Sequence, residues 1–337
     1  MGESERSATS GVSDQAGGSA NPGIGTMVAG LFKTLRPHQW IKNLFVLAPL
    51  FFSQQFTDPI KLALGLTAAL LFCLAAGSVY LINDIFDVEK DRKHPVKCKR
   101  PIPSGQLPIP VARVAAVGLS VGTVAVCGGL AWAFEAVDYW MAAAIGGYLV
   151  MNLAYSMVLK HWAFIDVSII ATGFVLRVLA GKFATGIWVS EWLIVCTFLL
   201  ALYLGMGKRV HELRMYLSGE TEKSRKVLDR YNPDHLEFGF LFVAGLTIAV
   251  YTIYTLTAAL PRLTGVLTMQ PLRSRPTPFA SPFLPVTVLF AVFGITRFFQ
   301  LANTDSPQSP TDLIVGDWPF VANLALWGVV MLGFSFY

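Results

Sequence analysis

The sequence predicts an all-α integral membrane protein, built as a bundle of nine transmembrane helices. The chain has 337 residues, of which 54% are hydrophobic and 14% are charged, and its mean hydropathy is +0.56. Such values are typical of integral membrane proteins and argue against a soluble fold. Apolar runs of about 17 to 25 residues recur along the chain, and this length matches the hydrocarbon core of a bilayer.

Nine runs of this kind define the predicted helices, at roughly 41–57, 61–82, 109–134, 139–159, 163–184, 190–206, 238–260, 282–301 and 318–337. The first run is the weakest, because a proline (Pro49) and two glutamines interrupt it. Residues 1–26 are rich in Gly, Ser and Ala and lack the apolar core of a signal peptide, so we expect a disordered cytoplasmic tail there. Residues 27–337 then form one membrane domain.

The distribution of Lys and Arg predicts the orientation of the bundle. With the N-terminus in the cytoplasm, nine spans place 19 of the 26 Lys and Arg residues on the cytoplasmic side. This bias follows the positive-inside rule and accounts for the net charge of +5, so nucleic-acid binding is not needed to explain it. We therefore predict a multi-pass protein of the inner (cytoplasmic) cell membrane, in contact with lipid.

The most informative segment is NDIFDVEKD at residues 83–91, which we call the aspartate motif. If the preceding helix continues through it, Asn83, Asp87 and Asp91 form one stripe about 12 Å long, with Asp84 beside it. Mg²⁺ prefers carboxylate and amide oxygens and usually takes phosphate oxygens as its other ligands. The motif therefore indicates a Mg²⁺-dependent phosphate site facing the cytoplasm, the alternative being a helix end with solvated acids.

Cations lie on both sides of the motif in the sequence. The loop after it contains Arg92, Lys99 and Arg100 among prolines that stop the helix. A polyanion bridged by metal would lie between these cations and the acids. Lys42 lies in a segment before the first span that either anchors the chain at the membrane interface or contacts substrate.

Two charges inside the fifth span are costly enough to be functional candidates. Asp166 and Arg177 are 11 residues apart, which is three helical turns and nearly the same face. Each could instead pair with a charge on a neighbouring helix, although the planar guanidinium of Arg177 suits a phosphate. Tyr155 and Lys160 end the fourth span on the same cytoplasmic side, where Tyr155 is either a membrane-interface tyrosine or a site residue.

The sixth span ends in GKRVHEL at residues 207–213. Lys208 and Glu212 are one turn apart and could form an ordinary surface pair. Their predicted place opposite the aspartate motif favours instead a ligand contact for Lys208 or Arg209.

At these residues the chain resembles the UbiA superfamily of intramembrane transferases. The matching elements are the aspartate motif, the KRPIPSG segment at 99–105, Tyr155 with Lys160, and nine helices in the right order, over about residues 30–337. The resemblance implies a central cavity open sideways to lipid, in which the motif holds Mg²⁺ and the diphosphate of a donor. It implies catalytic roles for Asp84, Asp87 and Asp91, with Asn83, Asp87 and Asp91 as metal ligands.

Most members of this superfamily transfer a prenyl group and have a second aspartate-rich motif after the sixth helix, where this chain is basic. That basic segment, with RPHQWIKN at 36–43, LKH at 159–161 and LRVLAG at 176–181, resembles the decaprenyl-phosphate phosphoribosyltransferase branch. The resemblance implies phosphoribosyl pyrophosphate as donor and a polyprenyl phosphate as acceptor, in a step toward arabinan and other cell-wall glycan precursors. The 5-phosphate of such a donor requires extra cations, and Lys208 and Arg209 would supply them.

Two other functions are weighed against this one. A prenyltransferase acting on an aromatic or quinone precursor would use the same first motif but would favour a second aspartate cluster. A transporter would use intramembrane charges as a substrate path and would show repeated halves, which the sequence lacks. The sequence is compatible with a homo-oligomer and leaves the length of the polyprenyl chain open.

Overall fold

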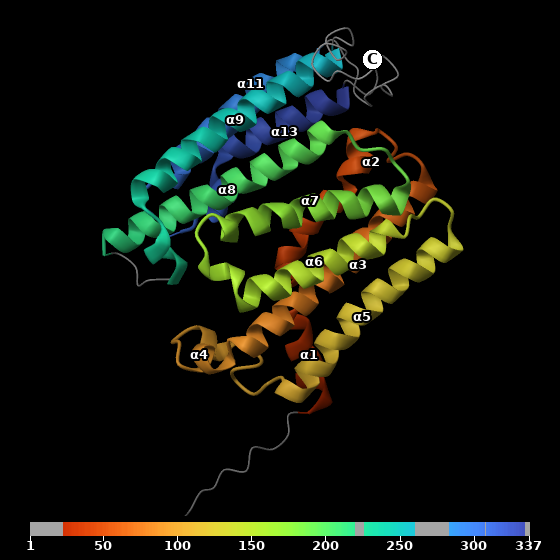
Figure 1. Cartoon of the computed structure of the whole chain (residues 1–337), viewed down its shortest axis with the longest axis vertical. Coiled ribbons are helices and arrows are strands. Elements are labelled where there is room, and N and C mark those ends of the chain that lie inside the picture. The colour runs from red at the N-terminus through yellow and green to blue at the C-terminus, as the bar shows by residue number, and fades with distance from the viewer. Residues whose placement is uncertain (1–22, 220–225, 260–282, 307, 334–337) are drawn as a thin grey trace, which may run out of the picture.

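The structure is a computed structural model of the chain and describes residues 23–219, 226–259, 283–306 and 308–333. The regular secondary structure of these residues consists of α-helices and 3₁₀ helices, without strands, so the predicted all-α class is confirmed for them (Figure 1). The predicted tail of residues 1–26 lies outside the described part up to residue 22, whereas residues 24–26 already belong to the first helix.

The α-helices are α1 (Ile24–Thr34), α2 (Ala48–Phe52), α3 (Pro59–Phe86), α4 (Val88–Arg92), α5 (Ile109–Ala133), α6 (Trp140–Met157), α7 (Ile165–Thr185), α8 (Glu191–Leu217), α9 (Pro233–Ala259), α11 (Val288–Ala302), α12 (Pro310–Gly316) and α13 (Trp318–Gly333). The 3₁₀ helices are η1 (Pro37–Leu47), η2 (Lys97–Lys99), η3 (Leu159–His161), η4 (Lys226–Arg230) and η5 (Leu284–Thr287).

Six helical segments in the described part are long and apolar enough to cross a membrane: α3, α5, α7, α8, α9, and η5 continued by α11. The pair α12 and α13 makes a seventh if its 75° bend lies within one broken span. Helix α6, where the fourth span is predicted, has 18 residues but is not among them. The structure thus supports a multi-spanning helical protein, and the predicted number of nine is not confirmed.

The predicted first span at 41–57 is not one helix. Its first part belongs to the 3₁₀ helix η1, its middle is the short helix α2, and Gln54 then has a positive φ of 59°. Pro49 explains part of this break, because it has no N–H to continue the hydrogen bonding of a preceding helix and instead suits the first turn of a new one. The interrupted segment lies against α3 and α7.

Glycines allow this segment to approach its neighbours closely. A Cβ added to Gly181 of α7 would lie 1.8 Å from the carbonyl oxygen of Val46. A Cβ added to Gly65 of α3 would lie 2.3 Å from Cδ1 of Leu50. Close approach at glycines is typical of helix packing in membranes, where small residues let neighbouring elements come together.

The interior has two main apolar cores, and α7 contributes to both. One core is formed mainly by α3, α5, α6 and the second half of α7, including Ala180 and Ala184. The other is formed mainly by α8, α9 and α11, with Val167 from the beginning of α7. Figure 1 shows α7 lying between α6 and α8. Polar side chains on α7 are therefore held where the two halves of the bundle meet.

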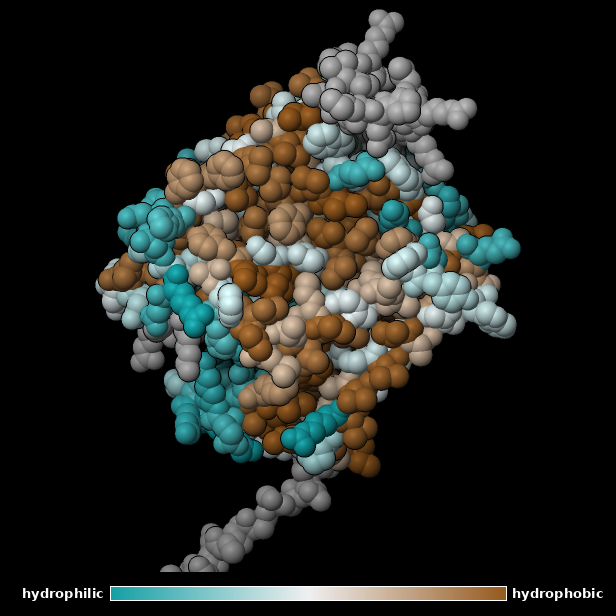
Figure 2. All heavy atoms as spheres, in the orientation of Figure 1, coloured by the Kyte–Doolittle hydropathy of each residue, from teal (hydrophilic) through white to brown (hydrophobic). Residues whose placement is uncertain are grey.

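The surface fits a lipid environment. Val114, Val117 and Val121 of α5 follow a helical spacing and are 74%, 63% and 63% exposed. Figure 2 shows apolar residues covering the middle of this face, with hydrophilic residues gathered at the edge over α4 and the end of α8. An apolar middle between polar edges matches a bilayer core between its two polar interfaces.

We predict that Gly181→Ala lowers the free energy of unfolding, because the new methyl group would collide with the Val46 carbonyl. Overpacking of this kind costs about 1–3 kcal/mol. The control is Gly118→Ala on α5, where nothing lies within 4 Å of the added Cβ. Thermal unfolding in detergent should show a lower melting temperature for the first variant alone, and equal melting temperatures would contradict the close approach of η1 to α7.

Candidate active site

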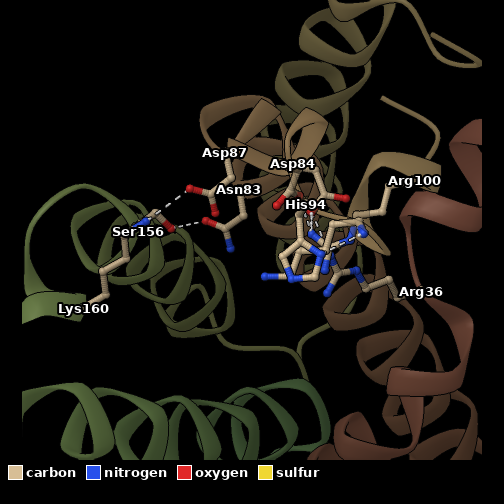
Figure 3. A network of polar contacts seen from close by, with 10 residues as sticks. Arg36, Asn83, Asp84, Asp87, His94, Arg100, Ser156 and Lys160 are labelled. Carbon is tan, nitrogen blue, oxygen red and sulfur yellow. Dashed lines mark hydrogen bonds and ion pairs between the residues drawn. The ribbon is translucent and has the colours of Figure 1, made fainter. Parts of the chain in front are cut away.

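The aspartate motif does not continue α3 as one helix. Helix α3 ends at Phe86, Asp87 follows with φ −92° and ψ 4°, and α4 begins at Val88. Backbone hydrogen bonds still join Asp87 to Asn83 and Asp91 to Asp87. The predicted single stripe is nevertheless wrong, because Asp91 pairs with Arg100 whereas Asp87 lies beside Lys160. The acids fall instead into two groups with different partners, shown in Figure 3.

The first group is the pair Asp84 and Asp91, whose carboxylates are bound to arginines. Arg36, just after α1, reaches Asp84 at 2.7 Å. Arg100 joins the two acids, with its Nη1 at 3.3 Å from Asp84 and 2.7 Å from Asp91. Both carboxylates are almost fully buried, with 4% and 3% of their side chains exposed. Arg36 also lies over the Tyr80 ring at 4.7 Å.

The second group is the pair Asn83 and Asp87, which lies on the other side of the motif and faces α6 (Figure 3). Asn83 accepts a hydrogen bond from the hydroxyl of Ser156 at the end of α6. Asp87 lies 3.6 Å from the Lys160 ammonium of η3, and 42% of its side chain is exposed. Of the three aspartates of the motif, Asp87 is therefore the one that a ligand can reach.

The donor set at the second group fits Mg²⁺. Asn83 and Asp87 offer an amide oxygen and a carboxylate one helical turn apart, and Mg²⁺ needs only one or two such protein ligands when water and phosphate complete its shell. Among the described residues, no group of three or more His, Cys, Asp or Glu side chains is arranged to hold a metal ion by itself. A Mg²⁺ ion at this position would complete its coordination with water and with phosphate oxygens of a substrate. Asp91, predicted as a third ligand, points instead to Arg100.

Asp166 of α7 and Arg209 of α8 form a buried ion pair, with Nε 2.8 Å from the carboxylate. Their side chains are 0% and 2% exposed. Asp166 also accepts a hydrogen bond from the Tyr231 hydroxyl, and Glu212 lies 2.6 Å from Nη1 of Arg209. In this structure the charge of Arg209 is compensated by Asp166 and Glu212, and the ligand contact expected at Lys208 or Arg209 stays a prediction. Glu212 pairs with Arg209 and not with Lys208.

Arg177 lies within the bundle without a carboxylate partner among the described residues. Its Nε donates to Oδ1 of Asn43 at 2.8 Å, and its Nη1 donates to the Gly173 carbonyl at 2.7 Å. The rings of Phe72 and Tyr148 lie 4.9 and 5.0 Å from the guanidinium carbon. Its predicted neighbour on the same helix face, Asp166, has other partners.

The remaining predicted site residues lie outside the two groups of the aspartate motif. Arg92 is exposed and pairs with the exposed Glu89 at 3.0 Å, and Lys99 is exposed on η2. Tyr155 is half-buried on the last turns of α6. Lys42 on η1 and Lys208 on α8 carry no ion pair with a described carboxylate.

Several polar residues of this region give no signal in the sequence. Ser156 and Tyr231 act through partners 73 and 65 positions away, and no local spacing indicates such contacts. Asn43 belongs to the RPHQWIKN segment, but nothing in that segment indicates its contact with Arg177, and Tyr148 lies in an apolar helix without any local signal. No acidic residue lies within ten positions of Arg177 in the sequence. This could have suggested that its guanidinium has neutral hydrogen-bond partners.

The sequence is similar to that of known membrane transferases. The sequence profile of the UbiA prenyltransferase family matches residues 43–216. A decaprenyl-phosphate phosphoribosyltransferase of Corynebacterium glutamicum is 31% identical over 296 residues, covering 86% of this chain and 81% of that protein. A protein of the same name from Mycolicibacterium smegmatis is 36% identical over 236 residues, covering 68% and 70% of the two chains.

Two solved structures have a fold similar to that of this chain. A UbiA homolog from Archaeoglobus fulgidus bound to DMAPP and Mg²⁺ superposes with a TM-score of 0.60, covering 90% of this chain and 98% of that one at 18% identity. A digeranylgeranylglyceryl phosphate synthase gives a TM-score of 0.56, covering 92% and 94% of the two chains at 14% identity. By its sequence match over more than half its length, this chain belongs to the UbiA prenyltransferase family.

Proposed function

We propose that the chain transfers a 5-phosphoribosyl group from phosphoribosyl pyrophosphate to a polyprenyl phosphate of the decaprenyl type, in a step toward cell-wall glycan precursors. The observation that carries the proposal is its similarity to decaprenyl-phosphate phosphoribosyltransferases, at 31% to 36% identity over 68% to 86% of this chain. The basic end of α8, with Lys208, agrees with a donor that carries a 5-phosphate in addition to its pyrophosphate.

The pyrophosphate of the donor belongs at the aspartate motif in this proposal. Asn83 and Asp87 would hold Mg²⁺, which supplies positive charge to the departing pyrophosphate. Lys160 lies 3.6 Å from Asp87 and is close enough to donate to the same anion. Arg36 and Arg100 are held in place by Asp84, and Asp91 holds Arg100 as well, so these two acids orient arginines instead of binding metal. The positive-inside rule favours a cytoplasmic opening of this site.

The chemistry requires positioning more than proton transfer. The bond between ribose C1 and the pyrophosphate oxygen breaks, and a bond between C1 and an oxygen of the acceptor phosphate forms. Pyrophosphate leaves with the electron pair, and a direct displacement inverts C1. Because the acceptor oxygen is already anionic, no general base is needed, and orientation of the two anions supplies the catalysis.

The experiment that tests the function offers the purified protein two donors, each with Mg²⁺. We expect product from phosphoribosyl pyrophosphate and a polyprenyl phosphate, detected as a lipid-linked phosphoribose by mass spectrometry. Prenyl diphosphates with an aromatic acceptor are the second arm, because the A. fulgidus homolog binds DMAPP. Product in the second arm alone would replace the proposed function by prenyl transfer.

We predict that Asp87→Asn lowers kcat/KM for the donor by roughly tenfold to a hundredfold, since a lost charged contact costs about 1.5–3 kcal/mol. It should also raise the Mg²⁺ concentration needed for half-maximal rate. Glu89→Gln is the control, because it removes the same charge from a side chain of α4 that is 78% exposed. Unchanged kinetics and Mg²⁺ dependence in Asp87→Asn would remove this residue from the site.

Arg209→Met should destabilise the protein, because it leaves Asp166 buried without its cation. Breaking a buried pair from one side typically costs about 3–5 kcal/mol. The control is Arg92→Met, which breaks an exposed pair worth about 0–1 kcal/mol. Thermal unfolding should separate the two variants, and a stable Arg209→Met with weakened donor binding would restore a substrate role for Arg209.

A further inference from the structure

Lys160 lies across from the exposed acid of the aspartate motif, and its position depends on the turn that follows it. It belongs to η3, which packs against α6, α7 and η4, and its ammonium is 3.6 Å from Asp87 (Figure 3). Three residues separate it from Phe164, the residue before α7. A lysine side chain is long and flexible. Its charge therefore has a defined place only if the backbone of this short connection is held.

Phe164 has a backbone conformation that side chains other than that of glycine rarely adopt. Its φ is 63° and its ψ is −34°. The Asp166 N–H donates to the Trp162 carbonyl at 3.1 Å, so the chain turns directly into α7 through this residue. A conformation of this kind costs free energy and persists only where the surrounding structure holds it. The turn at Phe164 therefore needs a partner outside its own segment.

Tyr231 holds this turn with both its hydroxyl and its ring. The hydroxyl accepts the Phe164 N–H at 2.9 Å and donates to the carboxylate of Asp166. The ring lies 5.1 Å from the ring of Phe164, with an angle of 68° between the two planes, which is a favourable edge-to-face arrangement. One side chain thus fixes the residue before α7 and a residue of its first turn.

Tyr231 is itself anchored in the second apolar core. It is buried there beside Val227 and Leu228 of η4, among residues of α8, α9 and α11, and its N–H donates to the Leu228 carbonyl at 3.3 Å. Helix α3, which leads into the aspartate motif, belongs to the other core. Tyr231 therefore ties the connection that carries Lys160 to the half of the bundle opposite the motif.

We propose that Tyr231 is a positioning residue, which places Lys160 for the binding of pyrophosphate through the turn at Phe164. The inference rests on the proposed function, in which Lys160 and a Mg²⁺ ion at Asp87 bind the pyrophosphate of the donor. The path runs from the Tyr231 hydroxyl to the Phe164 backbone and along the connection to η3. A cation held in advance loses less conformational freedom when it binds an anion.

The test measures binding of pyrophosphate with Mg²⁺ by titration calorimetry on the full chain in nanodiscs, so it does not depend on the group that the donor transfers. Tyr231→Phe keeps the ring and removes the hydroxyl, and it should weaken binding roughly twofold to tenfold, the effect of one lost neutral hydrogen bond. In a Lys160→Gln background the same substitution should cause no further loss. The matched control is Tyr203→Phe, which removes a buried hydroxyl that donates to the Ile295 carbonyl at 2.7 Å.

A lower melting temperature in both tyrosine variants with unchanged affinity in Tyr231→Phe would make the hydroxyl purely structural and overturn the inference. An equal further loss in the Lys160→Gln background would overturn it as well. If Tyr231→Phe does not fold, Phe164→Ala decides, because it removes an exposed ring of the same turn, and unchanged affinity there rejects the inference.

The wild type separates this inference from the proposed function. If it binds pyrophosphate but makes no product from phosphoribosyl pyrophosphate, the proposed function fails and the variants still decide the role of Tyr231. If it makes product while Tyr231→Phe binds normally, the inference fails and the function stands. A wild type that binds no pyrophosphate overturns the inference, because Lys160 then has no such anion to bind.

Discussion

The organisation of this protein depends on the compensation of charge inside an apolar bundle. The Asp166–Arg209 pair is the clearest case, because it joins α7 to α8 with both side chains almost fully buried. Tyr231 adds a third segment through its bond to Asp166 and also accepts from the Phe164 backbone. Ion pairs of this kind are weak evidence for stability as such, but once they are formed neither partner can be removed without leaving a buried charge.

The same constraint sorts the charged residues into those that hold structure and those that can bind ligands. Asp84 is compensated by Arg36 and Arg100, so its charge fixes two cations at the end of α3. Asp87 is half-exposed, and its ion pair within the described part of the chain is a long one to Lys160, so its carboxylate is available to a metal and a phosphate. In the proposed function the aspartate motif thus combines two tasks, orientation of arginines and binding of an anion, on opposite sides of one turn.

The break in the first apolar run contributes to the site. Because η1 is a 3₁₀ helix, its side chains lie on three faces, and the buried face brings Asn43 to Arg177. Arg36, at the start of η1 with a positive φ of 53°, turns toward Asp84. A regular helix would step 100° per residue and would distribute these side chains differently.

The sequence by itself determined the all-helical membrane class and the family, because apolar run length and a specific acidic motif are local properties of the chain. It also indicated Asp87, Lys160 and Arg177, since charge near or inside an apolar run is visible without a structure. Only the tertiary structure decided the partners: that α3 stops at Phe86, and that Arg209 neutralises Asp166. The physical reason is that compensation of a buried charge depends on which helices pack together, and the contacts that decide it join residues tens of positions apart.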